Sequence, residues 1–248
     1  MRKVFIICLF FLLTPFVLGK EIFVYRLGDK EGKSCQAVRI KDNWFLTAAH
    51  CVADVCNTAC KIEMQSADNI IETSQKNVFW PNDWRKNNAS YDIALINFKG
   101  AKIEEDFKEP QIIIADNSLK FTEPKIINRS LEIRYNLGNT FGGILSRYEV
   151  FYGPKSKTIF TQDLGLFHGL SGAGVFTDKG ELIAITSATA EREIDTRFSV
   201  FSVFDERVES FLRQKMPTLY FKHLSASDFK NINESKQDKE IVISLDNE

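Results

Sequence analysis

TAAHC at residues 47–51, YDIAL at residues 91–95 and GLSGAG at residues 169–174 are the stretches that decide the fold of this chain. Each places one reactive side chain beside an apolar or glycine-rich segment, in the chain order histidine, aspartate, serine. A serine hydroxyl becomes a nucleophile when a base takes its proton and a buried carboxylate orients that base. The three stretches therefore supply one candidate each for the base, the carboxylate and the nucleophile.

His50 is the candidate base. It follows an apolar run and directly precedes Cys51, so we expect it at the end of a strand. A lone histidine is more often a satisfied structural residue. The other two histidines, His168 and His223, lack such a setting, which favours His50.

Asp92 is the candidate orienting carboxylate, because it precedes the apolar run IALINF at 93–98 and should enter the edge of the core. A buried carboxylate is costly without a partner, and an imidazole N–H from His50 would satisfy it. Asp83, in a turn-like stretch, is the alternative carboxylate.

Ser171 is the candidate nucleophile. Gly169, Gly172 and Gly174 allow the sharp turn that a site needs when main-chain N–H groups must point at a substrate. Such a serine can also belong to nothing more than a tight loop. The strand-like segments that follow favour a rigidly held turn.

Length and composition place the chain among globular proteins. It has 248 residues, 44% of them hydrophobic, and a formal net charge of −1, so it can bury a sizeable core. A near-neutral chain without a long basic run has no electrostatic footprint for nucleic acid, and that class of partner is excluded.

The N-terminal segment MRKVFIICLFFLLTPFVLGK at 1–20 has two positive residues followed by an apolar run, which is typical of a signal peptide. We expect residues 1–19 to be removed near Gly19, giving a secreted or periplasmic protein with no stable membrane span. An uncleaved anchor is the alternative, but the run is short against the roughly 20 apolar residues that a span needs.

Cys35, Cys51, Cys56 and Cys60 then remain, and in an exported chain we expect them to form disulfides. Four cysteines allow three pairings, and the sequence does not choose among them. One of these joins Cys35 to Cys51 and leaves Cys56 with Cys60. A zinc site made by Cys51, Cys56 and Cys60 is disfavoured by the spacing.

Short runs rich in branched and aromatic residues, separated by turn residues, predict an all-β fold. The expected strands are EIFVY (21–25), QAVRI (36–40), NWFLTA (43–48), DIALINF (92–98), QIIIA (111–115), PKIIN (124–128), LEIRY (131–135), GILSRYEVFY (143–152), KTIFT (157–161), GAGVF (172–176), ELIAITSA (181–188) and RFSVFSVF (197–204). DERVESFLRQK at 205–215 predicts a helix with Asp205 as its N-cap, ended by Pro217. Residues 217–248 are expected to form a loosely packed polar tail or an edge strand at 241–245.

TAAHC, DIAL and the Gly-x-Ser-Gly turn, in this order over residues 35–205, resemble the chymotrypsin-like serine peptidases. The resemblance implies two antiparallel β-barrels with a triad in the cleft between them and a closing C-terminal helix. The implied peptidase domain covers 20–216, with barrels at about 20–105 and 110–204 and the helix at 205–216.

The same resemblance implies roles for individual residues. His50 would be the general base, Asp92 its orienter and Ser171 the nucleophile, with the backbone N–H groups of Gly169 and Ser171 as the oxyanion hole. The implied function is an exported serine endopeptidase that cleaves polypeptide substrates through an acyl-enzyme, with no cofactor and no metal. The alternative is a catalytically inactive protease-like binding protein or toxin-like factor.

Two departures from animal trypsins are visible. Those enzymes carry an aspartate directly before the nucleophile that pairs with a new N-terminus, whereas this chain has Leu170 and lacks an Ile-Val-Gly-Gly-like start. No such activation switch is therefore expected. TQDLGLFHGLSGAGVFTDKGELIAI at 161–185 is more similar to the bacterial glutamyl endopeptidases and the Deg/Htr proteases.

The resemblance also implies where substrate specificity arises. The residues expected to line the primary pocket are Gly165, His168, Ser187, Thr189 and Ser199. The histidine that glutamyl endopeptidases use on the strand around Ser187 is absent, and so is a trypsin-like aspartate at the pocket base. A mostly apolar or small pocket is therefore expected.

Overall fold

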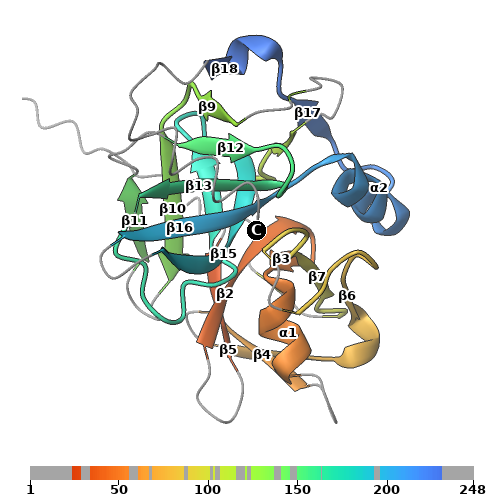
Figure 1. Ribbon diagram of the computed structural model, residues 1–248. Helices are drawn as coiled ribbons and strands as arrows, with labels where there is room; N and C mark the ends of the chain where they lie inside the picture. Colours follow the sequence, from red (N-terminus) through yellow and green to blue (C-terminus); the bar gives the residue numbers. More distant parts are fainter. Residues whose placement is uncertain are drawn as a thin grey trace, which may run out of the picture.

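Two β-sheets and two α-helices make up the described part of the molecule (Figure 1). The computed structural model describes residues 24–28, 34–55, 61–66, 69–86, 89–100, 103, 107–115, 121, 124–136, 141–145, 150–162, 164–192 and 196–230. The signal peptide expected at 1–19 lies outside these residues.

The first sheet has seven strands in the order β5-β4-β1-β2-β3-β7-β6 and is built from the first half of the chain. Its elements are β1 (Val24–Gly28), β2 (Ser34–Lys41), β3 (Trp44–Thr47), α1 (Ala49–Val55), β4 (Lys61–Ser66), β5 (Asn69–Ser74), the 3-10 helix η1 (Gln75–Asn77), β6 (Val78–Phe79) and β7 (Ala94–Asn97). All its pairings are antiparallel. Tyr25, Phe45 and Phe98 meet edge to face in its core.

The second sheet has eleven strands. Its elements are β8 (Ile112–Ile114), β9 (Lys125–Ile127), β10 (Leu131–Asn136), β11 (Phe141–Leu145), β12 (Phe151–Gly153), β13 (Thr158–Gln162), β14 (Gly174–Thr177), β15 (Leu182–Arg192), β16 (Thr196–Val203), β17 (Phe221–His223) and β18 (Phe229–Lys230). The main path runs β11-β10-β14-β15-β16-β13-β12-β9-β18 and is antiparallel, whereas β8 pairs in parallel with β15 and β17. The structure thus confirms the expected all-β, two-barrel class.

A hydrophobic cluster joins the two sheets. It contains Val38 and Leu95 from the first sheet, Phe176 and Leu182 from the second, and Leu212 from α2 (Glu206–Lys215). Figure 1 shows α2 beside the junction between the two halves. Because apolar burial stabilises by about 25 cal/mol per Å², this shared cluster fixes how the halves sit against each other.

The C-terminal helix follows the sequence prediction closely. Asp205 lies in extended conformation before α2, and its carboxylate accepts hydrogen bonds from the N–H groups of Arg207 and Val208, each at 3.0 Å. This is the N-cap that the sequence predicts. The helix ends at Lys215, two residues before Pro217.

Several features differ from the sequence expectations. The stretch expected as one strand at 143–152 is divided between β11 and β12. The hairpin of β4 and β5 was not expected. Residues 217–230 are packed instead of loose, because β17 pairs with β8, β18 pairs with β9, and the 3-10 helix η3 (Ala226–Asp228) lies between them. The strand expected at 241–245 lies outside the described residues.

Candidate active site

His50 and Asp92 are in direct contact. The backbone N–H of His50 donates to Oδ1 of Asp92 at 2.8 Å, and the imidazole Nδ1 lies 2.6 Å from Oδ2, to which it donates when protonated. Asp92 is 3% exposed, whereas a third of the His50 side chain remains accessible. The carboxylate is therefore buried behind an imidazole that still reaches solvent.

The local setting of His50 differs from the prediction. Strand β3 ends at Thr47, and His50 lies in the first turn of α1, not at the end of a strand. The N–H groups of a first helical turn have no partner within the helix. The Asp92 carboxylate accepts the one from His50, so helix formation itself helps to fix this pair.

Ser187 is a third donor to the same carboxylate. Its hydroxyl, on β15, donates to Oδ2 of Asp92 at 2.6 Å and is buried. The sequence led us to expect Ser187 in the substrate pocket, whereas its side chain is occupied with Asp92. With three hydrogen bonds from His50 and Ser187, the buried carboxylate avoids the cost of an unsatisfied charge.

A disulfide joins Cys35 on β2 to Cys51 on α1, directly after His50. Of the pairings that the sequence left open, this one is present. Cys51 Sγ lies 3.6 Å from Nε2 of His50. Because both sulfurs are bonded to each other, neither is a thiolate that could ligate zinc, and the zinc alternative loses Cys51. Cys56 and Cys60 lie outside the described residues.

Ser171 lies in a tight turn that is bound to the first sheet. The N–H of Gln36 on β2 donates to the Ser171 carbonyl at 2.7 Å, and the Gln36 side-chain amide donates to the Gly169 carbonyl at 3.0 Å. Gly172 has φ +85°, and a Cβ added there would lie 2.0 Å from the Gln36 carbonyl oxygen. Only glycine fits this close approach.

The N–H groups of this turn divide into two sets. Those of Leu170, Gly172 and Ala173 donate to the carbonyls of Phe167, Thr186 and Leu170, in that order. Within the described part of the chain, the N–H groups of Gly169 and Ser171 have no hydrogen-bond partner. These two groups are the donors that the sequence assigned to an oxyanion hole.

The turn is connected to the His50–Asp92 pair through β15. Gly172 N–H donates to the Thr186 carbonyl at 2.8 Å, and the next residue, Ser187, holds Asp92. Among the described residues the Ser171 hydroxyl has no hydrogen bond. Catalytic hydrogen bonds are often formed only once substrate is bound, so a Ser171 hydroxyl without a hydrogen bond is compatible with a base role for His50.

The other residues expected around a specificity pocket differ in their burial. Gly165 and His168 are exposed. Ser199 on β16 is fully buried, and its hydroxyl accepts the Leu164 N–H at 3.2 Å, so it supports the loop instead of facing a substrate. The backbone of Thr189 pairs with that of Ser199. Gly165 and His168 are therefore exposed, whereas Ser187 and Ser199 are buried.

The sequence analysis did not predict a pair of aromatic side chains that lies near the Ser171 turn. Phe167 is 42% exposed and packs edge to face against Tyr135 of β10, with ring centroids 5.7 Å apart. Leu170, which replaces the trypsin aspartate, is 1% exposed. A buried apolar residue cannot form an ion pair, and the absence of a zymogen switch stays a prediction.

The chain is similar to known proteins in part of its sequence and in its fold. The family model for trypsin matches residues 21–119, which include His50 and Asp92. A solved structure of mouse neuropsin, described as a serine protease expressed in the limbic system of mouse brain, aligns with 18% identity and a TM-score of 0.52. The alignment covers 79% of this chain and 95% of neuropsin. Residues 21–119 thus match the trypsin family model, and the chain has the fold of a trypsin-like serine protease.

The chain shares the neuropsin fold, and neither comparison supports the narrower resemblance to glutamyl endopeptidases or Deg/Htr proteases. A comparison with curated protein sequences finds no match. In the described part of the chain, no helix is long and apolar enough to cross a membrane.

Proposed function

We propose that this chain is an exported serine endopeptidase in which His50, Asp92 and Ser171 form the catalytic triad. The observation that carries the proposal is the His50–Asp92 pair, with an imidazole Nδ1 to carboxylate distance of 2.6 Å at a buried aspartate. A proton held on Nδ1 by the carboxylate leaves Nε2 unprotonated, which is the tautomer that a general base requires.

In the proposed mechanism the three groups act in sequence. Ser171 Oγ attacks the carbonyl carbon of the scissile peptide bond while His50 Nε2 takes its proton. The oxyanion that forms accepts hydrogen bonds from the N–H groups of Gly169 and Ser171. His50 then gives the proton to the leaving amine, and water hydrolyses the acyl-enzyme by the same route in reverse.

Export is supported by the Cys35–Cys51 disulfide, because such bonds persist in oxidising compartments. A secreted or periplasmic location follows, with polypeptides as substrates. The exposed positions at Gly165 and His168, beside the aromatic pair of Tyr135 and Phe167, support a preference for apolar over charged side chains.

A fluorophosphonate probe tests the proposal. The probe should label the wild-type protein and not Ser171→Ala, whereas Ser130→Ala, at an exposed serine, should label like the wild type. Labelling should also weaken below about pH 6.5, where imidazoles become protonated and cannot serve as base. A folded wild type that stays unlabelled would instead support the inactive, protease-like binding protein.

A further inference from the structure

The backbone just before Asp92 adopts an unusual conformation. Tyr91 has φ +59°, in the left-handed region that bulky residues rarely occupy. Its carbonyl accepts the Ile93 N–H at 2.7 Å, which folds the chain tightly around Asp92 before β7 begins at Ala94. The direction in which the Asp92 carboxylate leaves the chain therefore depends on the backbone angle of Tyr91.

A hydrogen bond to Asp205, the N-cap of α2, holds Tyr91 in this conformation. The phenol donates to Oδ2 of Asp205 at 3.1 Å, across 114 positions of sequence. Asp205 is fully buried, and its other oxygen caps α2 through the N–H groups of Arg207 and Val208. The carboxylate is thus fixed independently of Tyr91 and provides a rigid acceptor.

The groups around Tyr91 keep the phenol protonated. Burial, then the negative charge of Asp205 and the hydrogen bond to it, raise the pKa of Tyr91 to about 12, against the opposing effect of Arg207. The Arg207 guanidinium lies 5.7 Å from the centre of the Tyr91 ring and is paired with Asp83 at 3.3 Å. Tyr91 therefore remains a hydrogen-bond donor above the pH at which an ordinary tyrosine ionises.

We propose that Tyr91 is a positioning residue: its hydrogen bond to Asp205 holds the left-handed turn that aims the Asp92 carboxylate at His50. Strained backbone conformations persist where the surroundings over-determine them, and they cluster at active sites. The inference rests on the proposed function. If it is correct, the geometry of the His50–Asp92 pair depends on Asp205, the N-cap of α2.

Tyr91→Phe tests the hydroxyl, with Tyr220→Phe, at a residue 70% exposed, as the control. We expect kcat to fall about tenfold with KM nearly unchanged. The acid limb of the pH profile of kcat/KM should move to lower pH, because a misdirected Asp92 stabilises the imidazolium less. Loss of thermal stability without these two changes would mean a purely structural role and would overturn the inference.

Tyr91→Gly and Tyr91→Ala separate the backbone from the side chain. Both variants remove the ring and the hydroxyl, but only glycine adopts φ near +59° without strain. The glycine variant should therefore retain about tenfold more kcat than the alanine variant. Equal activities would contradict a role in holding the turn.

A final measurement does not depend on turnover. The low-field proton NMR signal of the His50 Nδ1–H reports the hydrogen bond to Asp92 even in an inactive protein, and it should broaden or shift upfield in Tyr91→Phe. A wild type that is not labelled by fluorophosphonate refutes the proposed function. An unchanged proton signal in Tyr91→Phe refutes the positioning role of Tyr91.

Discussion

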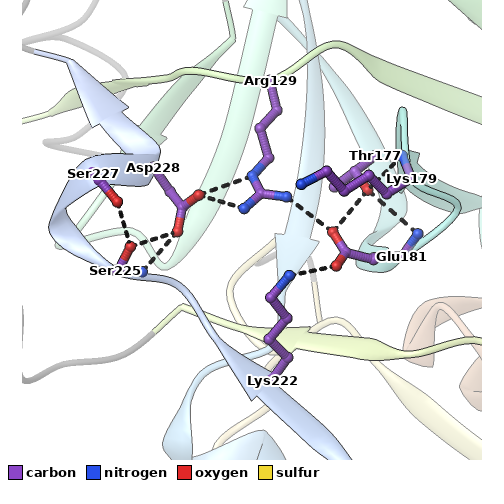
Figure 2. Close-up of polar contacts among 8 residues, drawn as sticks. All are labelled: Arg129, Thr177, Lys179, Glu181, Lys222, Ser225, Ser227 and Asp228. Atoms are coloured by element: carbon purple, nitrogen blue, oxygen red, sulfur yellow. Dashed lines mark hydrogen bonds and ion pairs between the residues drawn. The ribbon is translucent and has the colours of Figure 1, made fainter.

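Replacing Arg129 by Met should remove the central cation of a buried ion network. Figure 2 shows the Arg129 guanidinium between two carboxylates, Glu181 and Asp228. Arg129 Nη1 donates to Glu181 at 2.9 Å, and Nε donates to Asp228 at 3.1 Å. Lys222 on β17 reaches the other oxygen of Glu181 at 2.6 Å. The network therefore ties the C-terminal segment 217–230 to the turn between β14 and β15.

The magnitude follows from burial. The side chains of Arg129, Glu181 and Asp228 are 11%, 8% and 16% exposed, so removing the arginine leaves two largely buried carboxylates with fewer partners. Losing one partner of a buried pair costs about 3–5 kcal/mol. The lower end, about 3 kcal/mol, applies because Lys222 still holds Glu181. For a chain of this size that corresponds to a Tm lower by about 6–12 °C.

The pH dependence gives a second signature. Burial alone would raise the pKa of Glu181, but hydrogen bonds from Lys222 and Thr177 and the charges of Lys222 and Arg129 outweigh it, so the pKa lies below 4.5. The pKa of Asp228 is likewise lowered: burial opposes the shift, and the hydrogen bonds from Ser225 and Arg129 outweigh it. The stability from both carboxylates is thus present above about pH 4.5 and is lost as the pH falls through the lowered values.

Urea unfolding between pH 3 and 7 is the assay, with Arg85→Met, at an exposed arginine, as the matched control. The control should change the free energy of unfolding by less than about 0.5 kcal/mol. Arg129→Met should unfold at lower urea concentration at pH 7 and show a flatter decline toward pH 3. If Arg129→Met matches the control at pH 7, the network does not contribute as its burial implies.

Three further predictions concern the active-site region. Ser187→Ala should lower kcat/KM about tenfold in steady-state assays, because Asp92 loses one of its three donors; an unchanged value would show that the His50 contacts suffice. The double variant Cys35→Ser/Cys51→Ser opens a loop with a sequence separation of 16 and should destabilise by about 3 kcal/mol in thermal or urea unfolding. Gly172→Ala should abolish fluorophosphonate labelling, because its Cβ would lie 2.0 Å from a main-chain oxygen at φ +85°; labelling at the wild-type rate would disprove that close approach.

Local signals predicted most of the second half of the chain correctly. Alternating apolar runs marked β13, β14, β15 and β16, and the spacing behind Asp205 marked α2 with its cap. His50 was misplaced because the apolar run before it continues through Ala48 and Ala49, and an alternation rule does not detect a short helix after a strand.

Contacts between distant segments could not be predicted from local patterns. Ser187 has no feature that distinguishes it from the other polar residues of β15, and its contact with Asp92 appears only when the two sheets pack. The polar composition of 217–230 suggested a loose tail, yet β17 pairs with β8 and Asp228 binds Arg129. Charged residues usually lie on the surface, and only the fold shows which of them are buried in pairs.

The position of Asp92 shows how the second half of the chain controls a group in the first. Asp92 precedes β7 of the first sheet, but Ser187 lies 95 positions away on β15 and Asp205, which holds Tyr91, lies 114 positions from that tyrosine. A carboxylate fixed only by neighbours in its own sheet would keep its direction whatever the other half did. Because two of its constraints come from β15 and α2, the His50–Asp92 geometry depends on correct packing of both halves. Substitutions at β15 or at the start of α2 should therefore affect catalysis through Asp92, even though they lie on the other side of the junction.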